Sequence, residues 1–263
     1  NGDSNLAKAK DQADKNIDDV AKAAKQAIDK TSGLTADQKQ TAKGQIDQAV
    51  TDAKEKIKNA SDNKGVVDAT DAGKLAIDKD AAKAAIDKAL DNTKSEINLA
   101  TNLDQPTKDK LIKAATDAAD KAKDAITQAT TNKDVATEQT KGTQAIDAVK
   151  LTSLTDSQTA AKAAIDKALD NTKSEINLAT NLDQPTKDKL IKAATDAADK
   201  AKDAITQATT NKDVATEQTK GTQAIDAVKL TSLTDSQTAA KAAVDAAAAK
   251  QKELINNSNN LSA

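Results

Sequence analysis

One stretch of 79 residues occurs twice in this chain without a single change. Residues 81–159 are repeated at 160–238, and a further repeat begins at Ala239. An active site needs one set of special residues, whereas a tandem array multiplies one surface. Repetition over this length is typical of proteins that stack supersecondary units. We therefore expect a modular structural protein.

The N-terminal part of the chain is a diverged version of the same repeat. We define the first repeat as 1–80, the second as 81–159 and the third as 160–238, and 239–263 as the start of an incomplete further repeat with a frayed C-terminus. The first repeat aligns with the second at an offset of 69 residues. Its Ile17, Ile28, Leu34, Ile57, Val66, Gly73 and Ile77 correspond to Ile86, Ile97, Leu103, Ile126, Val135, Gly142 and Ile146.

The composition excludes most functional chemistry. The 263 residues include no Cys, His, Met, Trp, Tyr, Phe or Arg. The chain therefore lacks thiol nucleophiles, imidazole bases, His or thiolate metal ligands, and rings or guanidinium groups that stack on bases and hold phosphates. The formal net charge of −2 disfavours DNA or an anionic membrane as partner, and no apolar run reaches the roughly 18 residues of a membrane span. We predict no enzyme, no cofactor, no metal, no nucleic-acid partner and no membrane insertion.

Each repeat is predicted to form three helices. In the second repeat, the first helix is expected over about 81–100, and the second from the N-cap Asp104, with Pro106 in its first turn, to about Thr130. The third follows the break at 130–134. Apolar residues recur every three or four positions, and the predicted faces are Ile86, Leu90, Thr93, Ile97 and Ala100; Leu111, Ala115, Ala118, Ala122, Ile126 and Ala129; and Val135, Gly142, Ile146 and Val149.

The first junction between repeats is predicted to be helical. Ile77 is followed directly by the first helix of the next repeat, with no Gly or Pro between them. One unbroken helix is therefore expected from about Val66 to Ala100. In the first repeat, Thr35 and Gln38 have the spacing of a capping box that starts the second helix.

The later junctions are predicted to be loops. Ten additional residues follow Ile146, and the segment LTSLTDSQ (151–158) suggests a linker in which Thr155 and Gln158 form a capping box. A helix is expected from about 236 to 256, and residues 255–263 are expected to fray.

A folded bundle competes with disorder, because the core is thin. The second repeat has thirteen Ile, Leu and Val among 79 residues, a low share for a globular domain. A desiccation-protectant chain has similar composition but typically shows eleven-residue repeats. The near-zero net charge, the helix-forming Ala, Lys and Gln, and the agreement between caps and apolar spacing favour folding. We predict an all-α fold of three-helix bundles, stacked end to end into an elongated monomeric rod.

Acidic residues in the second helix suggest two kinds of site. The stretch TDAADKAKD (116–124) lacks the central Gly and final Glu of a calcium loop. Asp117 and Asp120 are a candidate acid–base pair, but such chemistry needs a burial that nothing in the sequence predicts. A solvated helix face is the stronger interpretation, with ion pairs at the favourable spacing: Asp109–Lys113 and Asp117–Lys121.

Glycine occurs at one equivalent position in each repeat, inside a predicted helix. These residues are Gly73, Gly142 and Gly221. Glycine costs about 1 kcal/mol relative to alanine in a helix interior. No glycine-rich phosphate loop surrounds them, so we predict that they permit close helix packing.

The first repeat has one further pattern, formed by Leu34, Thr35, Gln38, Lys39, Ile46, Ala49, Ala53, Ile57, Ala60, Ser61, Val66, Gly73 and Ile77. This pattern resembles the tandem helical repeats of cell-wall-anchored surface proteins of Gram-positive bacteria, a repeat family of unknown function. In the later repeats Asp104 and Pro106 depart from the Leu-Thr opening, and Ala115 replaces the first Ile.

The resemblance implies a location and partners. It implies an extracellular fibrous region at the bacterial cell wall, between an N-terminal adhesive domain and a C-terminal anchor, in an adhesin or biofilm factor. The implied role is a stalk. The alternative is that the repeats themselves bind host matrix, mucin or neighbouring cells through weak multivalent contacts. Because the chain begins with Asn rather than Met, we expect a piece of a longer protein. No catalytic residue carries over from the family.

Overall fold

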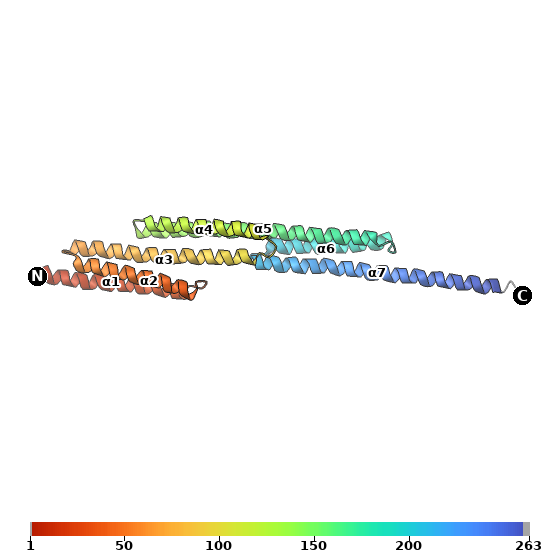
Figure 1. Cartoon of the computed structure of the whole chain (residues 1–263), viewed down its shortest axis with the longest axis horizontal. Coiled ribbons are helices and arrows are strands. Elements are labelled where there is room, and N and C mark those ends of the chain that lie inside the picture. Colours follow the sequence, from red (N-terminus) through yellow and green to blue (C-terminus); the bar gives the residue numbers. More distant parts are fainter. Residues whose placement is uncertain (1, 260–263) are drawn as a thin grey trace. The chain divides into compact units, whose positions relative to one another are not determined.

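The computed structural model describes residues 2–259, and within this range the chain forms seven α-helices and no strands (Figure 1). The predicted all-α class is confirmed. The helices are α1 (Gly2–Lys30), α2 (Ala36–Asn59), α3 (Asn63–Leu99), α4 (Gln105–Gln128), α5 (Asn132–Leu178), α6 (Gln184–Gln207) and α7 (Asn211–Asn259).

The helices belong to two compact units. The first unit comprises the chain up to Leu99 together with Asp104–Ser153, and the second comprises Ala100–Leu103 together with the chain from Leu154 onward. The first unit holds two hydrophobic cores, one formed by α1, α2 and α3 and the other by α3, α4 and α5. The second unit holds one core, formed by α5, α6 and α7.

Helix α3 joins the two cores of the first unit. Its N-terminal half contributes Val66 and Ile77 to the first core, and its C-terminal half contributes Ile86 and Leu90 to the second. The helix runs without a break over 37 residues. The predicted helical junction from about Val66 to Ala100 is therefore confirmed, and the two cores of this unit share one continuous helix.

The predicted helix starts at Thr35 and Asp104 are also confirmed. The Thr35 hydroxyl accepts from the Gln38 amide (3.2 Å) and the Gln38 side chain accepts from the Thr35 amide (2.8 Å), which completes a capping box. Asp104 caps α4 by accepting from the Thr107 amide at 2.8 Å, with Pro106 in the first turn. Asp183 caps α6 in the same way.

Buried positions follow the predicted apolar spacing closely. On α3 and the residue after it, each member of the predicted face is at most 7% exposed. On α4 the prediction was wrong at one position, because Ala119 is fully buried whereas Ala118 is only partly buried. Ala115, Ala119 and Ala122 are spaced by four and then three residues, so Ala119 lies nearer the centre of the buried face. The buried residues of α4 are Leu111, Ala115, Ala119, Ala122 and Ile126.

The predicted linker at 151–158 was wrong, because this segment lies inside the continuous helix α5. The equivalent segment 230–237 lies inside α7. Neither segment contains Gly or Pro, so nothing in them breaks a helix. The Thr152 hydroxyl donates to the carbonyl of Ala148 (3.0 Å), four residues earlier, a bond that lets threonine remain in a helix interior. Ser153 and Ser157 are completely buried on one face.

The predicted capping box of Thr155 and Gln158 is therefore also wrong. Both residues are helical, and the Gln158 side chain instead donates to carbonyls at the C-terminus of α6, including those of Ile205 and Ala208 at 3.1 Å. Gln158 thus donates hydrogen bonds to backbone carbonyl groups at the end of another helix rather than capping the start of its own.

Polar contacts between helices recur at equivalent positions and supplement the thin cores. A lysine from the second helix of each repeat pairs with an aspartate of the first helix, a contact worth about 0–1 kcal/mol at the surface. A second set of side chains satisfies carbonyls at the C-terminus of the second helix. The ion pairs are Lys54–Asp18 (2.7 Å), Lys123–Asp87 and Lys202–Asp166 (3.0 Å), and the donors are Lys10 to Lys58 O (2.6 Å), Lys79 to Thr127 O (2.8 Å) and Gln158 to Thr206 O (3.2 Å).

The C-terminal part of α7 extends beyond the third core. Val244 is 66% exposed, although the equivalent Ile165 in the preceding repeat is completely buried. The helix predicted over about 236–256 is present, and it continues to Asn259. The predicted fraying of 255–263 stays a prediction, and residues 260–263 lie outside the described residues.

Candidate functional site

Each core contains one glycine at a close approach between helices. A β-carbon added to Gly73 would lie 2.5 Å from the Ala53 β-carbon and 2.8 Å from Ile17 Cδ1. The same Ile Cδ1 separation of 2.8 Å recurs at Gly142 and Gly221. Real β-carbons do not approach other atoms this closely. The prediction that these glycines serve helix packing is confirmed.

An open groove lies over each of these glycines, between the second and third helices of the repeat. The groove at Gly142 has a volume of about 510 Å³ and a floor of alanines that includes Ala118 and Ala122. Lys141 stands at its edge and pairs with Glu138 at 2.7 Å. Equivalent grooves occur at Gly73 (about 350 Å³) and at Gly221 (about 510 Å³). Their linings offer methyl groups and exposed charges, and no nucleophile next to a base.

The acidic stretch of α4 forms a solvated surface, as predicted. Asp117 and Asp120 are both exposed, so neither has the burial that acid–base catalysis requires. The partner of Lys113 differs from the prediction, because Lys113 pairs with Asp117 at 2.7 Å rather than with Asp109. Among residues 2–259, no group of three or more Asp or Glu side chains is arranged to hold a metal ion.

Shifted pKa values occur at structural positions. Hydrogen bonds from Thr107 lower the pKa of Asp104, and those from Thr186 lower the pKa of Asp183, because an N-cap carboxylate is stabilised in its charged form. Burial raises the pKa of Asp80, and the nearby Lys83 opposes that shift. These shifts arise from helix caps and partial burial.

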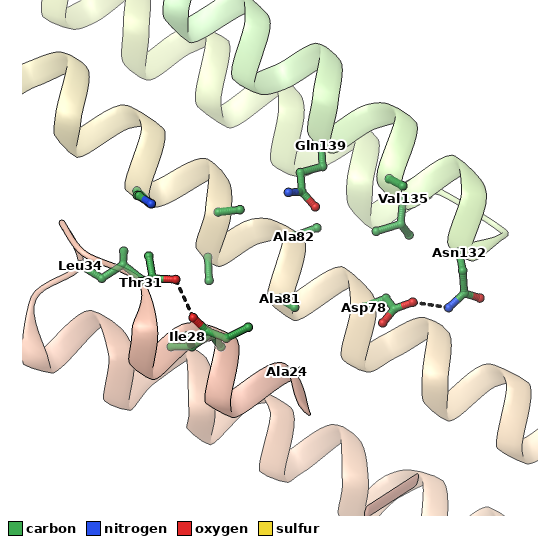
Figure 2. Close-up of a pocket in the computed structure, with 15 residues that line it drawn as sticks. Ala24, Ile28, Thr31, Leu34, Asp78, Ala81, Ala82, Asn132, Val135 and Gln139 are labelled. Carbon is green, nitrogen blue, oxygen red and sulfur yellow. Dashed lines mark hydrogen bonds between the residues drawn. The ribbon is translucent and has the colours of Figure 1, made fainter. Parts of the chain in front are cut away.

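A cavity of about 380 Å³ lies at the junction of the first two repeats, within the first unit (Figure 2). Ile28, Leu34 and Val135 line it together with several alanines. At its edges the Asn132 side chain donates to Asp78, and the Thr31 hydroxyl donates to the Ala27 carbonyl at 2.7 Å. The sequence analysis did not predict this cavity. Its only sequence signal is the set of four alanines at 81, 82, 84 and 85, whose small side chains leave space between the helices.

A protein-family model, Domain of Unknown Function (DUF1542), matches this chain three times in succession, over residues 9–80, 78–154 and 157–233. The chain belongs to this family. The resemblance inferred from the sequence, to a tandem repeat family of unknown function, is thereby confirmed. No curated protein and no solved structure matches the chain significantly. Among residues 2–259, no helix is both long and apolar enough to cross a membrane.

The three DUF1542 segments repeat one set of structural contacts. Each contains a packing glycine, an ion pair between its first two helices and a side chain that satisfies the end of its second helix. These three recurrent features stabilise the helices or the contacts between them.

Proposed function

We propose that this chain is a non-catalytic structural stalk of a bacterial cell-surface adhesin, in which the repeats hold a terminal binding domain away from the cell wall. The supporting observation is the helical junction inside the first unit. Val66 and Ile77 of α3 belong to one core, and Ile86 and Leu90 of the same helix belong to the next. A continuous helix makes a stiffer connection between cores than a flexible linker does.

The repeat chemistry supports the same proposal. Because the second and third repeats are identical, adding or removing one changes the length of the array without changing its surface chemistry. The recurring contacts are helix caps, ion pairs and glycine packing, all of which maintain structure. A spacer needs these properties and needs no reactive group.

Small-angle X-ray scattering on chains of increasing length tests the proposal. A further copy of residues 160–238 is inserted after Thr238, once and then twice. The longest dimension is expected to increase by a constant amount with each insertion. Each inserted copy has the same helices, and a helix has a fixed rise per residue. A longest dimension that stays nearly constant while the mass increases would show a compact particle and refute the spacer role.

The alternative is that the repeats themselves are weak binding modules for host matrix, mucin or other cells. The observation that favours it is the groove at Gly73, Gly142 and Gly221, which presents one surface three times. Repeated weak sites gain affinity through multivalency. Binding of the whole chain to fibronectin, fibrinogen, mucin and itself distinguishes the two roles. Saturable submicromolar binding would favour the binding module, and no saturation would favour the stalk.

A further inference from the structure

The loop between α3 and α4 makes a specific polar contact at the second junction. The Asn102 side chain donates through Nδ2 to the carbonyl oxygen of Ser157 (2.7 Å) and to Oε1 of Gln218 (3.2 Å). In return, the Ser157 hydroxyl donates to Asn102 Oδ1 at 2.7 Å. Ser157 lies in α5 and Gln218 in α7. All three residues belong to the second compact unit.

Asn102 and Ser157 satisfy each other's hydrogen-bonding groups at this partly buried contact. The Ser157 side chain is completely buried, and its hydroxyl has the Asn102 oxygen as acceptor. The Asn102 amide uses both hydrogens as donors and its oxygen as acceptor. A buried hydroxyl without a hydrogen-bond partner lowers the stability of the fold. Replacing Asn102 with alanine would remove the acceptor of the buried Ser157 hydroxyl.

The third repeat provides an internal comparison. Asn181 occupies the position equivalent to Asn102 in an identical sequence, yet it is exposed. Within the described part of the chain, its side chain has no hydrogen bond, whereas Asn102 is half-buried. The amino-acid sequence around the two asparagines is the same. The difference therefore comes from the DUF1542 segment at 157–233, which follows Asn102 and contains both of its partners, Ser157 and Gln218.

The first junction has a different arrangement. Gly33 stands at the position of Asn102, Asp78 at that of Ser157, and Gln139 at that of Gln218. Gly33 has no side chain to reach across, and Asp78 instead accepts from Asn132. The cavity of about 380 Å³, lined by both Asp78 and Gln139, lies at this junction (Figure 2).

We propose that Asn102 is a lock residue that couples the folding of the DUF1542 segment at 78–154 to that of the segment at 157–233. Its loop is a contact surface for a following DUF1542 segment that carries serine and glutamine at the positions of Ser157 and Gln218. The coupling operates at the junction of identical repeats and is absent from the first junction. This inference goes beyond the spacer role and stands whether or not the repeats act as a stalk.

Calorimetric unfolding of the full chain tests the lock, with Asn102→Ala and the matched control Asn181→Ala. A loss of about 1–2 kcal/mol at a buried hydrogen bond corresponds to a fall in the melting temperature of about 2–8 °C in a chain of this size. We expect a fall in this range and a broader transition for Asn102→Ala. Asn181→Ala should lie within about 1 °C of the original chain, a typical result for an exposed side chain.

A double-mutant cycle separates the lock from a simple loop effect. Ser157→Ala removes only the hydroxyl, and Ser236→Ala is its matched control in the third repeat. If the contact is real, the combined Asn102→Ala/Ser157→Ala chain should melt higher than the sum of the two separate shifts predicts. Equal shifts for Asn102→Ala and Asn181→Ala, or full additivity in the cycle, would overturn the proposal. These results leave the scattering test of the stalk unaffected.

Discussion

Replacing Gly73 with alanine should destabilise the first core despite the better helix propensity of alanine. The new β-carbon would lie 2.5 Å from the Ala53 β-carbon and 2.8 Å from Ile17 Cδ1, whereas carbon atoms pack best at about 3.5–4.0 Å. The Ile17 methyl group can move by a rotamer change. The Ala53 methyl group is fixed to the backbone of α2, so α2 and α3 must separate by about 1 Å.

The expected magnitude follows from two opposing terms. Overpacking a well-packed core costs about 1–3 kcal/mol, and alanine gains about 1 kcal/mol over glycine in a helix interior. We therefore expect Gly73→Ala to lower the free energy of unfolding by up to about 2 kcal/mol. Gly44 of α2 is the matched control, because an added β-carbon there has no atom within 4 Å. Gly44→Ala should raise the free energy by about 0.5–1 kcal/mol.

Urea unfolding followed by far-ultraviolet circular dichroism measures both variants in the same repeat. Adding Ala53→Gly to Gly73→Ala removes the clashing methyl group, so the double variant should be more stable than the sum of the separate effects by about 1 kcal/mol or more. If Gly73→Ala stabilises the chain as much as Gly44→Ala does, the close approach of α2 and α3 does not exist in solution, and the packing role of all three glycines is wrong.

Three further predictions concern single positions. The Thr93 hydroxyl is fully buried without a hydrogen-bond partner among the described residues, so Thr93→Val should raise the free energy of unfolding in urea by about 1 kcal/mol; a loss of stability would contradict this reasoning. Asp104 and Asp183 have lowered folded pKa values, so their contribution to stability is present above the unfolded pKa of about 3.9 and is lost as the pH falls through the folded value. Replacing both with asparagine, which also caps helices well, should flatten the dependence of the melting temperature on pH below about 4, and an unchanged slope would refute the assignment. Ile165→Ala should cost about 2–5 kcal/mol, whereas Val244→Ala, at an equivalent but 66% exposed position, should change the urea unfolding free energy by less than about 0.5 kcal/mol; a comparable loss at Val244 would show that a partner covers α7 in solution.

The helix starts at Thr35 and Asp104 and most buried positions were predictable because their signals are local. Thr35 and Gln38, or Asp104 and Thr107, lie three residues apart, so one turn of helix brings them together. The apolar spacing likewise defines a helix face without knowledge of its partner. The proposed absence of a catalytic site also came from sequence, since it depends on which residue types the chain lacks. These parts of the analysis require only neighbours along the chain.

The junctions required knowledge of the whole fold. The segment 151–158 has residues that suit both a loop and a helix. Burial of Ser157 and its hydrogen bond to Asn102, 55 positions away, favour the helix. The bonds from Gln158 to the end of α6 also join distant segments. The sequence prediction named Ala118 where the structure buries Ala119. This error has a similar cause, because the centre of a buried helix face depends on how the opposing helices lie.

The sequence alone thus determined the number of repeats, the helical class and the need for glycine between helices, because each is encoded in composition or in spacings of three and four residues. Only the tertiary structure decided that helices continue through the later junctions and that identical asparagines have different surroundings. Asn102 and Asn181 share every neighbour in sequence. Their hydrogen bonding differs because Ser157 and Gln218, both in the DUF1542 segment at 157–233, contact Asn102, whereas Asn181 is exposed.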